Sequence, residues 1–279
     1  MNKGILFILI SGVFFSIINA LVKYLHHIPA LEIVLFRSII SLLLSYTAIY
    51  RRNESIFSRH TPLLLGRGIT GSIALCLYFY TIQKIPLATA VTILYLAPIF
   101  TILLAIFIVK EYPSWKQIPF FLLSFVGATL LKSFDPRVDL LYFSMALIAA
   151  FFAGLAYNFI RLLKGKVGHH VVIIYFPLVT IPLVLPFVVP IWVTPNIEEL
   201  VGLIGIGLLT QLAQIFMTKA YMLEKASKIS QFSYLTSVYA YLTGIIFFDE
   251  HMGTMSLIGL LLILIGLFFS SYFSEKEEV

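Results

Sequence analysis

Charged residues and cysteine are both scarce in this sequence. Only 11% of its 279 residues are charged, whereas 60% are hydrophobic. A soluble domain carries about 25% charged residues, so this chain has too few to cover a water-facing surface. The single cysteine, Cys76, stands inside an apolar run and can form no disulfide within the chain. The composition therefore excludes a soluble globular protein, and cysteine usage does not indicate a redox compartment.

The motifs of common enzymes are missing as well. No GxxxxGK[ST] segment occurs, which argues against ATP hydrolysis, and no buried set of serine, histidine and acid stands out. The histidine pairs at 26–27 and 169–170 lack ligand spacing suited to zinc. The glycines of 66–71 match a dinucleotide pattern but open an apolar helix and follow no strand. We therefore expect no enzyme, no cofactor and no metal site.

Acidic residues number only thirteen, and Glu32 is the one that falls inside an apolar stretch, close to its end. Proton-driven carriers usually need a carboxylate within the membrane. Coupling to protons therefore has little support from the sequence, and facilitated movement or exchange fits at least as well.

Long apolar stretches dominate what is present. About 20 apolar residues span a bilayer as a helix, and continuous rather than alternating hydrophobicity favours helices over a barrel. The sequence predicts an all-α integral membrane protein in which no link is long enough for a soluble domain. The ten predicted spans cover residues 4–22, 29–50, 62–82, 85–109, 114–131, 140–163, 171–193, 200–223, 229–248 and 252–273.

The distribution of basic residues predicts the orientation. With the N-terminus in the cytoplasm, thirteen Lys and Arg residues fall in cytoplasmic links and four in external links, while Arg37 and Arg67 lie within spans. Cytoplasmic links carry an excess of Lys and Arg. We therefore expect a multi-pass protein of the cytoplasmic membrane with both termini inside. The positive net charge of +6 is explained by this topology, so we expect no nucleic-acid partner.

The chain repeats one plan twice. A constant shift of 139 residues aligns Asn19 with Asn158, and it also aligns Tyr95, Leu96, Glu111 and Gly127 with Tyr234, Leu235, Glu250 and Gly266. The two units are residues 1–134 and 135–279, with five spans each. Because five is odd, the second unit enters the membrane from the opposite side. Inverted repeats of this kind are a recurring plan of secondary transporters, with the substrate near the midplane.

Several motifs in this order resemble the EamA-type drug/metabolite transporter superfamily. They are Ala88–Thr89–Ala90, Tyr95–Leu96–Ala97–Pro98, Lys110–Glu111 and Gly127, with a weaker second copy in Tyr234–Leu235, Asp249–Glu250 and Gly266, together with Phe36–Arg37 and Arg67–Gly68. The resemblance covers nearly the whole chain. It implies a basket in which spans 5 and 10 stand apart while the other eight surround a central cavity. It also implies gradient-driven movement of a small organic metabolite. Ser237 departs from the pattern, because the second copy has no proline matching Pro98.

Arg37 is the sharpest candidate for substrate contact. It lies about 12 Å inside its span at 1.5 Å per residue, and charged residues at such depth usually face a cavity or a partner. The alternative is a structural role, paired with Glu32 or with backbone carbonyls. Arg67, Arg161, Lys219 and Lys23 stand near helix ends, where their side chains would reach the headgroups.

The other candidates are polar or aromatic side chains within spans, and prolines that interrupt them. Amides between membrane helices bind helices together more often than they bind ligands, whereas aromatic faces with a few polar groups suit a small-molecule site. Glu111 and Glu250 end their spans, and we interpret them as structural partners of a following helix N-terminus. The predicted cavity residues are Asn19, Arg37, Tyr80, Tyr95, Asn158, Gln211, Gln214, Tyr234 and Tyr239, and the predicted kink or gating residues are Pro98, Pro177, Pro182, Pro186 and Pro190.

The function these features favour is a secondary transporter of an amino-acid-like, zwitterionic or anionic metabolite, working by alternating access and in the export direction. One alternative is an importer or exchanger of a nucleotide-like or vitamin metabolite. An alternative of another class is an intramembrane lipid-handling protein or enzyme. The expected partners are a small-molecule substrate and the lipid bilayer, with the chain acting as a monomer.

Overall fold

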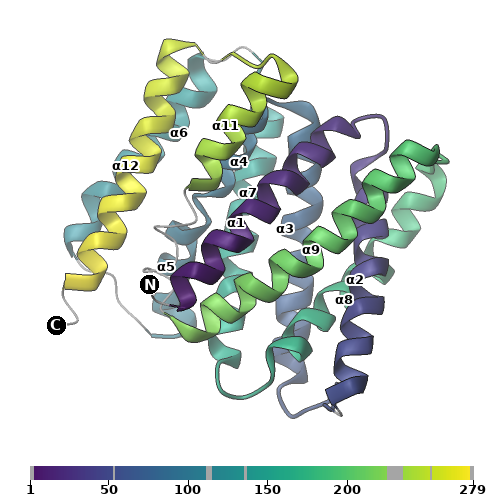
Figure 1. Ribbon diagram of the computed structural model, residues 1–279. Coiled ribbons are helices and arrows are strands. Elements are labelled where there is room, and N and C mark those ends of the chain that lie inside the picture. The colour runs from purple at the N-terminus through teal and green to yellow at the C-terminus, as the bar shows by residue number, and fades with distance from the viewer. Residues whose placement is uncertain are drawn as a thin grey trace.

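Every element of secondary structure among the described residues is a helix (Figure 1). The computed structural model describes residues 3–52, 54–110, 115–134, 137–224, 235–251 and 253–276. The elements are α1 (Lys3–Tyr24), α2 (Ala30–Arg52), α3 (Thr61–Lys84), α4 (Leu87–Leu94), α5 (Ala97–Ile108), η1 (Trp115–Gln117), α6 (Ile118–Phe134), α7 (Leu140–Leu163), α8 (His169–Val188), η2 (Val189–Ile191), α9 (Ile197–Leu223), α11 (Leu235–Phe248) and α12 (Thr254–Lys276).

These helices agree with the predicted spans. Seven stretches are long and apolar enough to cross a membrane, with α4 and α5 counted together and α8 extended by η2. Helices α6, α11 and α12 occupy the positions of spans 5, 9 and 10. The prediction of an all-α membrane protein with ten spans in two repeats is confirmed.

The fourth span is broken where the sequence predicts. Helix α4 ends at Leu94 and α5 begins at Ala97. Proline lacks an N–H and its ring collides with the carbonyl four residues earlier, and for Pro98 that carbonyl belongs to Leu94. The amide of Leu96 instead donates to the Ile93 carbonyl at 3.0 Å, which tightens the last turn of α4.

The prolines of the seventh span behave differently. Pro177, Pro182 and Pro186 lie inside α8, which stays helical through all three. The helix changes to the 3-10 element η2 at Val189, and Pro190 stands within that element. The chain therefore leaves the α-helix only at the last of the four prolines.

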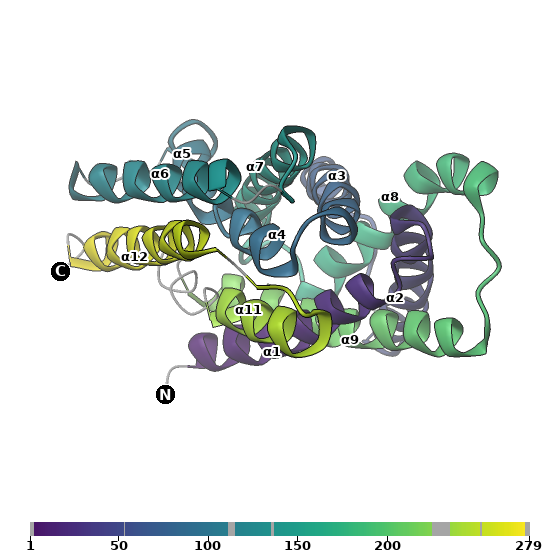
Figure 2. The same cartoon turned by 90° about the horizontal axis from the view of Figure 1, so that it is seen from above.

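Helices of the first repeat pack against helices of the second in reciprocal pairs (Figure 2). Helix α1 contacts α9 and its counterpart α7 contacts α3. In the same way α5 contacts α7 and α11 contacts α1. Helices α2 and α8 contact each other, as do α6 and α12, which stand to one side of the remaining helices (Figure 2). Reciprocity of this kind is what two structurally equivalent halves produce.

Two glycines let α6 and α12 approach closely. A Cβ atom at Gly127 would collide with the Gly259 carbonyl and Ile263, and one at Gly266 would collide with the Phe120 carbonyl. The shift of 139 that relates Gly127 to Gly266 also relates Phe120 to Gly259. The peripheral pair is therefore symmetric at its crossing, and the close approach depends on small residues.

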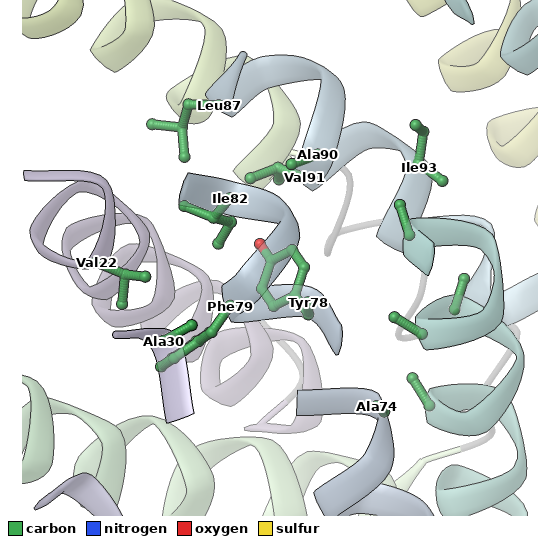
Figure 3. Close-up of a cluster of buried hydrophobic side chains, with 14 of the residues drawn as sticks. Val22, Ala30, Ala74, Tyr78, Phe79, Ile82, Leu87, Ala90, Val91 and Ile93 are labelled. Carbon is green, nitrogen blue, oxygen red and sulfur yellow. The ribbon is translucent and has the colours of Figure 1, made fainter. Parts of the chain in front are cut away.

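Two groups of buried apolar side chains lie toward opposite ends of the helix bundle. The first, here the Leu87 cluster, is the part of the larger core formed by Val22, Ala74, Tyr78, Phe79, Ile82, Leu87, Ala90 and Val91 (Figure 3). The second, here the Leu163 cluster, comprises Ile8, Ile49, Leu64, Ile160, Leu163, Val171, Val172, Ile174, Tyr175, Met217, Ala220 and Tyr221. Because successive helices run in opposite directions, the end of α1 and the start of α4 meet in the first cluster, whereas the start of α1 and the end of α7 meet in the second.

Candidate functional site

A cavity lies between the two clusters. Its wall contains members of both, since Ala74, Tyr78 and Phe79 belong to the Leu87 cluster and Met217 and Tyr221 to the Leu163 cluster. Eight spans contribute described residues to the wall, namely those of α1, α2, α3, α4–α5, α7, α8, α9 and α11, and neither α6 nor α12 does. The polar side chains of the wall are Ser11, Asn19, Arg37, Arg67, Tyr78, Tyr95, Tyr157, Gln214, Tyr221 and Thr236.

Arg37 reaches the cavity from α2 and is only 2% exposed. Its Cζ lies 5.5 Å from the ring centroid of Phe79 and 5.2 Å from that of Phe176. Aromatic faces attract a guanidinium through their quadrupole. The Nε atom of Arg37 is buried without a hydrogen-bond partner. Glu32 does not pair with it, because the Glu32 Oε2 atom accepts a hydrogen bond from the Val193 N–H at 3.0 Å.

Arg67 is a second cavity arginine that sequence reasoning missed. Its side chain is 3% exposed, with Cζ 5.0 Å from the Phe176 ring centroid and Nη2 donating to Gln214 Oε1 at 3.5 Å. The Nε and Nη1 atoms have no partner. The expectation that Arg67 reaches the headgroups is wrong, since the side chain faces α8 and α9. The surrounding small residues Gly66, Gly68 and Gly71 were the available signal, because they let neighbouring helices enclose it.

Three more of the predicted cavity residues line the cavity. Asn19 and Gln214 are 3% and 8% exposed, and Tyr95 stands at the break between α4 and α5 beside Pro98. An amide on α1, an amide on α9 and a phenol at a helix break therefore share one wall with the two arginines.

Four predicted cavity residues are not among those that line it. Asn158 donates to the Thr101 carbonyl at 2.9 Å and to that of Gly154, and so ties α7 to α5. Gln211 bonds two serines of α2. Tyr80 and Tyr239 are 37% and 39% exposed and face away from the bundle interior.

The positions of these four side chains depend on contacts between helices, which the sequence does not show. A side-chain amide at a contact between two helices forms its hydrogen bonds with backbone or hydroxyl groups of the neighbouring helix. The ring centroids of Tyr80 and Tyr142 lie 6.1 Å apart in a tilted arrangement, and Lys84 Nζ lies over the Tyr80 ring. Tyr234 and Glu111 lie outside the described residues.

An aromatic pair near one end of the cavity was also missed. Tyr157 of α7 and Tyr221 of α9 stack with ring centroids 4.9 Å apart and an interplanar angle of 16°. Both line the cavity. The repeat offered a partial signal, because Tyr221 aligns with Tyr80 in the first unit.

An ion pair lies at the outer end of the Leu87 cluster, next to Leu87. Lys23 Nζ lies 2.9 Å from Glu250 Oε1 and also donates to the Ile85 carbonyl at 2.7 Å. Glu250 Oε2 accepts from the Leu87 N–H at 2.7 Å, at the start of α4. The expectation that Glu250 caps the helix that follows it is therefore corrected, because it caps α4 of the other repeat. Asp249, with φ of 51°, turns the chain at the end of α11.

The chemistry of the site is that of binding. No group of three or more His, Cys, Asp or Glu that could hold a metal occurs in the part of the chain that the structure describes. The described wall of the cavity likewise contains no aspartate or glutamate. What the wall offers is two guanidinium groups, amides, phenols and apolar surface, which is the composition of a small-molecule site.

The chain is similar to known membrane transporters along its full length. The EamA-like transporter family model matches residues 2–133 and again 140–272. The pseudopaline exporter CntI of Pseudomonas aeruginosa strain PAO1 is 33% identical over 275 residues, which cover 95% of each chain. The S-adenosylmethionine uptake transporter of Rickettsia prowazekii is 26% identical over 285 residues, covering 99% of this chain and 95% of the relative.

A solved crystal structure has the same fold. It superposes with a TM-score of 0.71 at 18% identity and covers 99% of both chains. The two matches of the family model agree with the reciprocal packing of the two repeats. The chain is a multi-pass membrane transporter of small metabolites, not an enzyme, and it belongs to the EamA-like transporter family.

Proposed function

We propose that this protein exports a small anionic or zwitterionic organic metabolite across the cytoplasmic membrane by alternating access. The observation that carries the proposal is Arg37, a buried cation in a cavity whose described wall holds no acid. An unpaired charge away from water is costly, and intramembrane charges usually serve a substrate path. A carboxylate of the substrate would form the strong, charge-assisted hydrogen bonds that the guanidinium lacks.

Both termini are placed in the cytoplasm in this proposal. The basis is the bias of thirteen cytoplasmic against four external basic residues. Lys23, the start of α4 and Glu250 then lie at the external face, and the Leu163 cluster lies toward the cytoplasm. Export is favoured because a full-length relative is named as an exporter.

Alternating access would use the two apolar clusters as gates. The cavity lies between them, so opening the Leu163 cluster would admit substrate from the cytoplasm and opening the Leu87 cluster would release it outside. The proposed moving units are residues 1–134 and 135–279, which correspond to the two repeats. Pro98 stands in the cavity wall at the α4–α5 break, where a helix without continuous hydrogen bonds can bend at low cost.

A second candidate function is uptake or exchange of a nucleotide-like metabolite. It is favoured by the similarity to a relative named as an S-adenosylmethionine uptake transporter. The same cavity would serve either direction, so the two candidates differ in which side of the membrane gains the substrate.

The test compares metabolites inside and outside cells that express the wild type, Arg37→Ala or the control Lys84→Gln. Lys84 is exposed, and its Nζ lies over the Tyr80 ring, 5.8 Å from the centroid. We expect an anionic or zwitterionic metabolite to accumulate outside with the wild type and the control but not with Arg37→Ala. Depletion of a metabolite from the medium would instead support uptake. Identical metabolite profiles in wild-type and non-expressing cells, with the protein shown in the membrane, would refute the proposal.

A further inference from the structure

Both cavity arginines, Arg37 and Arg67, have buried hydrogen-bond donors without a partner. Arg37 Nε, Arg67 Nε and Arg67 Nη1 are each buried without a partner. Buried donors in proteins are almost always paired. The atoms belong to two guanidinium groups on two helices, α2 and α3, so the missing acceptors are required in two places.

The charge of the cavity is also unbalanced by two. Nothing in its described wall is acidic, and Glu32, the acid of α2, is bonded to the Val193 N–H instead. Among the described residues, the arginines lie against the faces of Phe79 and Phe176, and Arg67 donates to the Gln214 amide oxygen. These groups carry partial charges, so two full positive charges face the same cavity.

The spacing of the two charges is bounded by the ring they share. The Cζ atoms of Arg37 and Arg67 lie 5.2 Å and 5.0 Å from the centroid of Phe176, so they are at most about 10 Å apart. One small molecule can reach both. The space around them is lined by apolar side chains, among them Leu75, Ala153 and Met217, which suit a short hydrocarbon body.

We propose that the substrate carries two anionic oxygen groups, one held by Arg37 and the other by Arg67, on a short apolar body such as that of a dicarboxylate. This inference rests on the proposed function, because it takes the cavity as the transport site. Each carboxylate would accept two hydrogen bonds from the planar guanidinium fork. A monoanion would satisfy one arginine and leave the other unpaired.

The test is binding of a matched series of probes to the purified, folded protein, measured as the shift of the unfolding temperature with ligand concentration. The dianions are the straight-chain dicarboxylates from succinate to suberate, and the monoanions are their monoamides. The wild type should bind the best dicarboxylate at least tenfold more tightly than its monoamide, since a charged pair is replaced by a neutral contact. In Arg67→Gln this preference should disappear while the monoamide still binds.

A variant that keeps the charge but moves it provides a second measurement should Arg67→Gln fail to fold. A Cβ at Gly71 would collide with Arg67 Nη1 and lie close to the Phe176 ring, so Gly71→Ala displaces the guanidinium. Gly205→Ala is the matched control, because a Cβ there meets nothing nearer than Leu21 at 4.0 Å. We expect Gly71→Ala to lose the dicarboxylate preference and Gly205→Ala to keep it.

The outcomes separate this inference from the proposed function. Equal binding of dicarboxylates and monoamides by the wild type, or equal loss of both in Arg67→Gln, would overturn the two-anion inference. So would a metabolite in the export assay that carries a single negative charge, and in that case export itself would stand. Absence of any exported or imported metabolite would instead remove the transport proposal on which the inference rests.

Discussion

Replacing Glu250 with glutamine should open the proposed external face of the transporter. The Glu250 carboxylate joins three segments at once, because it contacts Lys23 at the end of α1 and the Leu87 N–H at the start of α4 while it follows α11. Lys23 adds a bond to the Ile85 carbonyl. The contacts therefore tie the first repeat to the second directly over the Leu87 cluster, and they must break if that cluster is to part.

The size of the effect follows from burial and charge. The side chains of Lys23 and Glu250 are 17% and 12% exposed, so water screens the pair incompletely. Glutamine keeps an acceptor for the Leu87 N–H but removes the charge that Lys23 and the α4 N-terminus both favour. A hydrogen bond to a charged group contributes about 1.5–3 kcal/mol, so we expect a loss of about 2 kcal/mol, which is roughly 30-fold in the open-to-closed ratio.

Thiol labelling of a buried cluster residue measures this ratio. Val91 is fully buried in the Leu87 cluster, and Val91→Cys in a Cys76→Ala background would place one thiol there. A membrane-impermeant maleimide added to intact cells should react about 30-fold faster in Glu250→Gln, because a buried site reacts only when it opens. Lys84→Gln is the control and should leave the rate unchanged. An unchanged rate in Glu250→Gln, or an equal rise in both variants, would refute the gate assignment.

Three further predictions concern the scaffold. Gly127→Ala and Gly266→Ala should each lower the unfolding temperature by similar amounts, equivalent to about 1–3 kcal/mol of overpacking, and Gly205→Ala should not; unequal losses would contradict the symmetric α6–α12 crossing. Gln211→Leu should reduce stability by about 0.6–1.7 kcal/mol and leave substrate affinity unchanged. Transport measured at a low and a high substrate concentration would check this, and weaker substrate binding would show that Gln211 belongs to the site. Pro98→Ala should join α4 to α5, raising the unfolding temperature while slowing transport, and unchanged turnover would remove the α4–α5 break from the mechanism.

Helix positions were predictable from the sequence because spans are long, apolar and separated by charged links. Pro98 marked its break for a local reason, the missing N–H and the collision with Leu94. Arg37 was identifiable because its depth is a property of one helix. The depth of a residue in its span does not reveal which face of the helix its side chain occupies. For this reason Arg67 was assigned to the headgroups although it is buried against α8 and α9.

Contacts between the repeats were beyond the reach of sequence reasoning. Glu250 bonds Leu87, 163 residues away, and nothing in the local sequence selects α4 over the helix that follows. Repeat equivalence was also an incomplete guide to role. Asn19 lines the cavity, whereas the amide nitrogen of its equivalent Asn158 donates to backbone carbonyls of α5 and α7.

The two-fold plan of the scaffold is broken at the candidate site. The shift of 139 that relates the repeats carries Arg37 onto Phe176, the residue whose ring its guanidinium faces. Helices α2 and α8 begin at positions related by the same shift, Ala30 and His169, so the equivalence is structural as well. A symmetric pair of cations here would repel each other, whereas a cation against an aromatic face attracts. The two arginines in the described wall of the cavity both come from the first repeat, so an anionic substrate would be held by α2 and α3 with its apolar part toward the second repeat. Motion of one repeat against the other would then alter the contacts of the apolar part and leave the charge contacts intact, which allows the gates to alternate while the substrate stays paired.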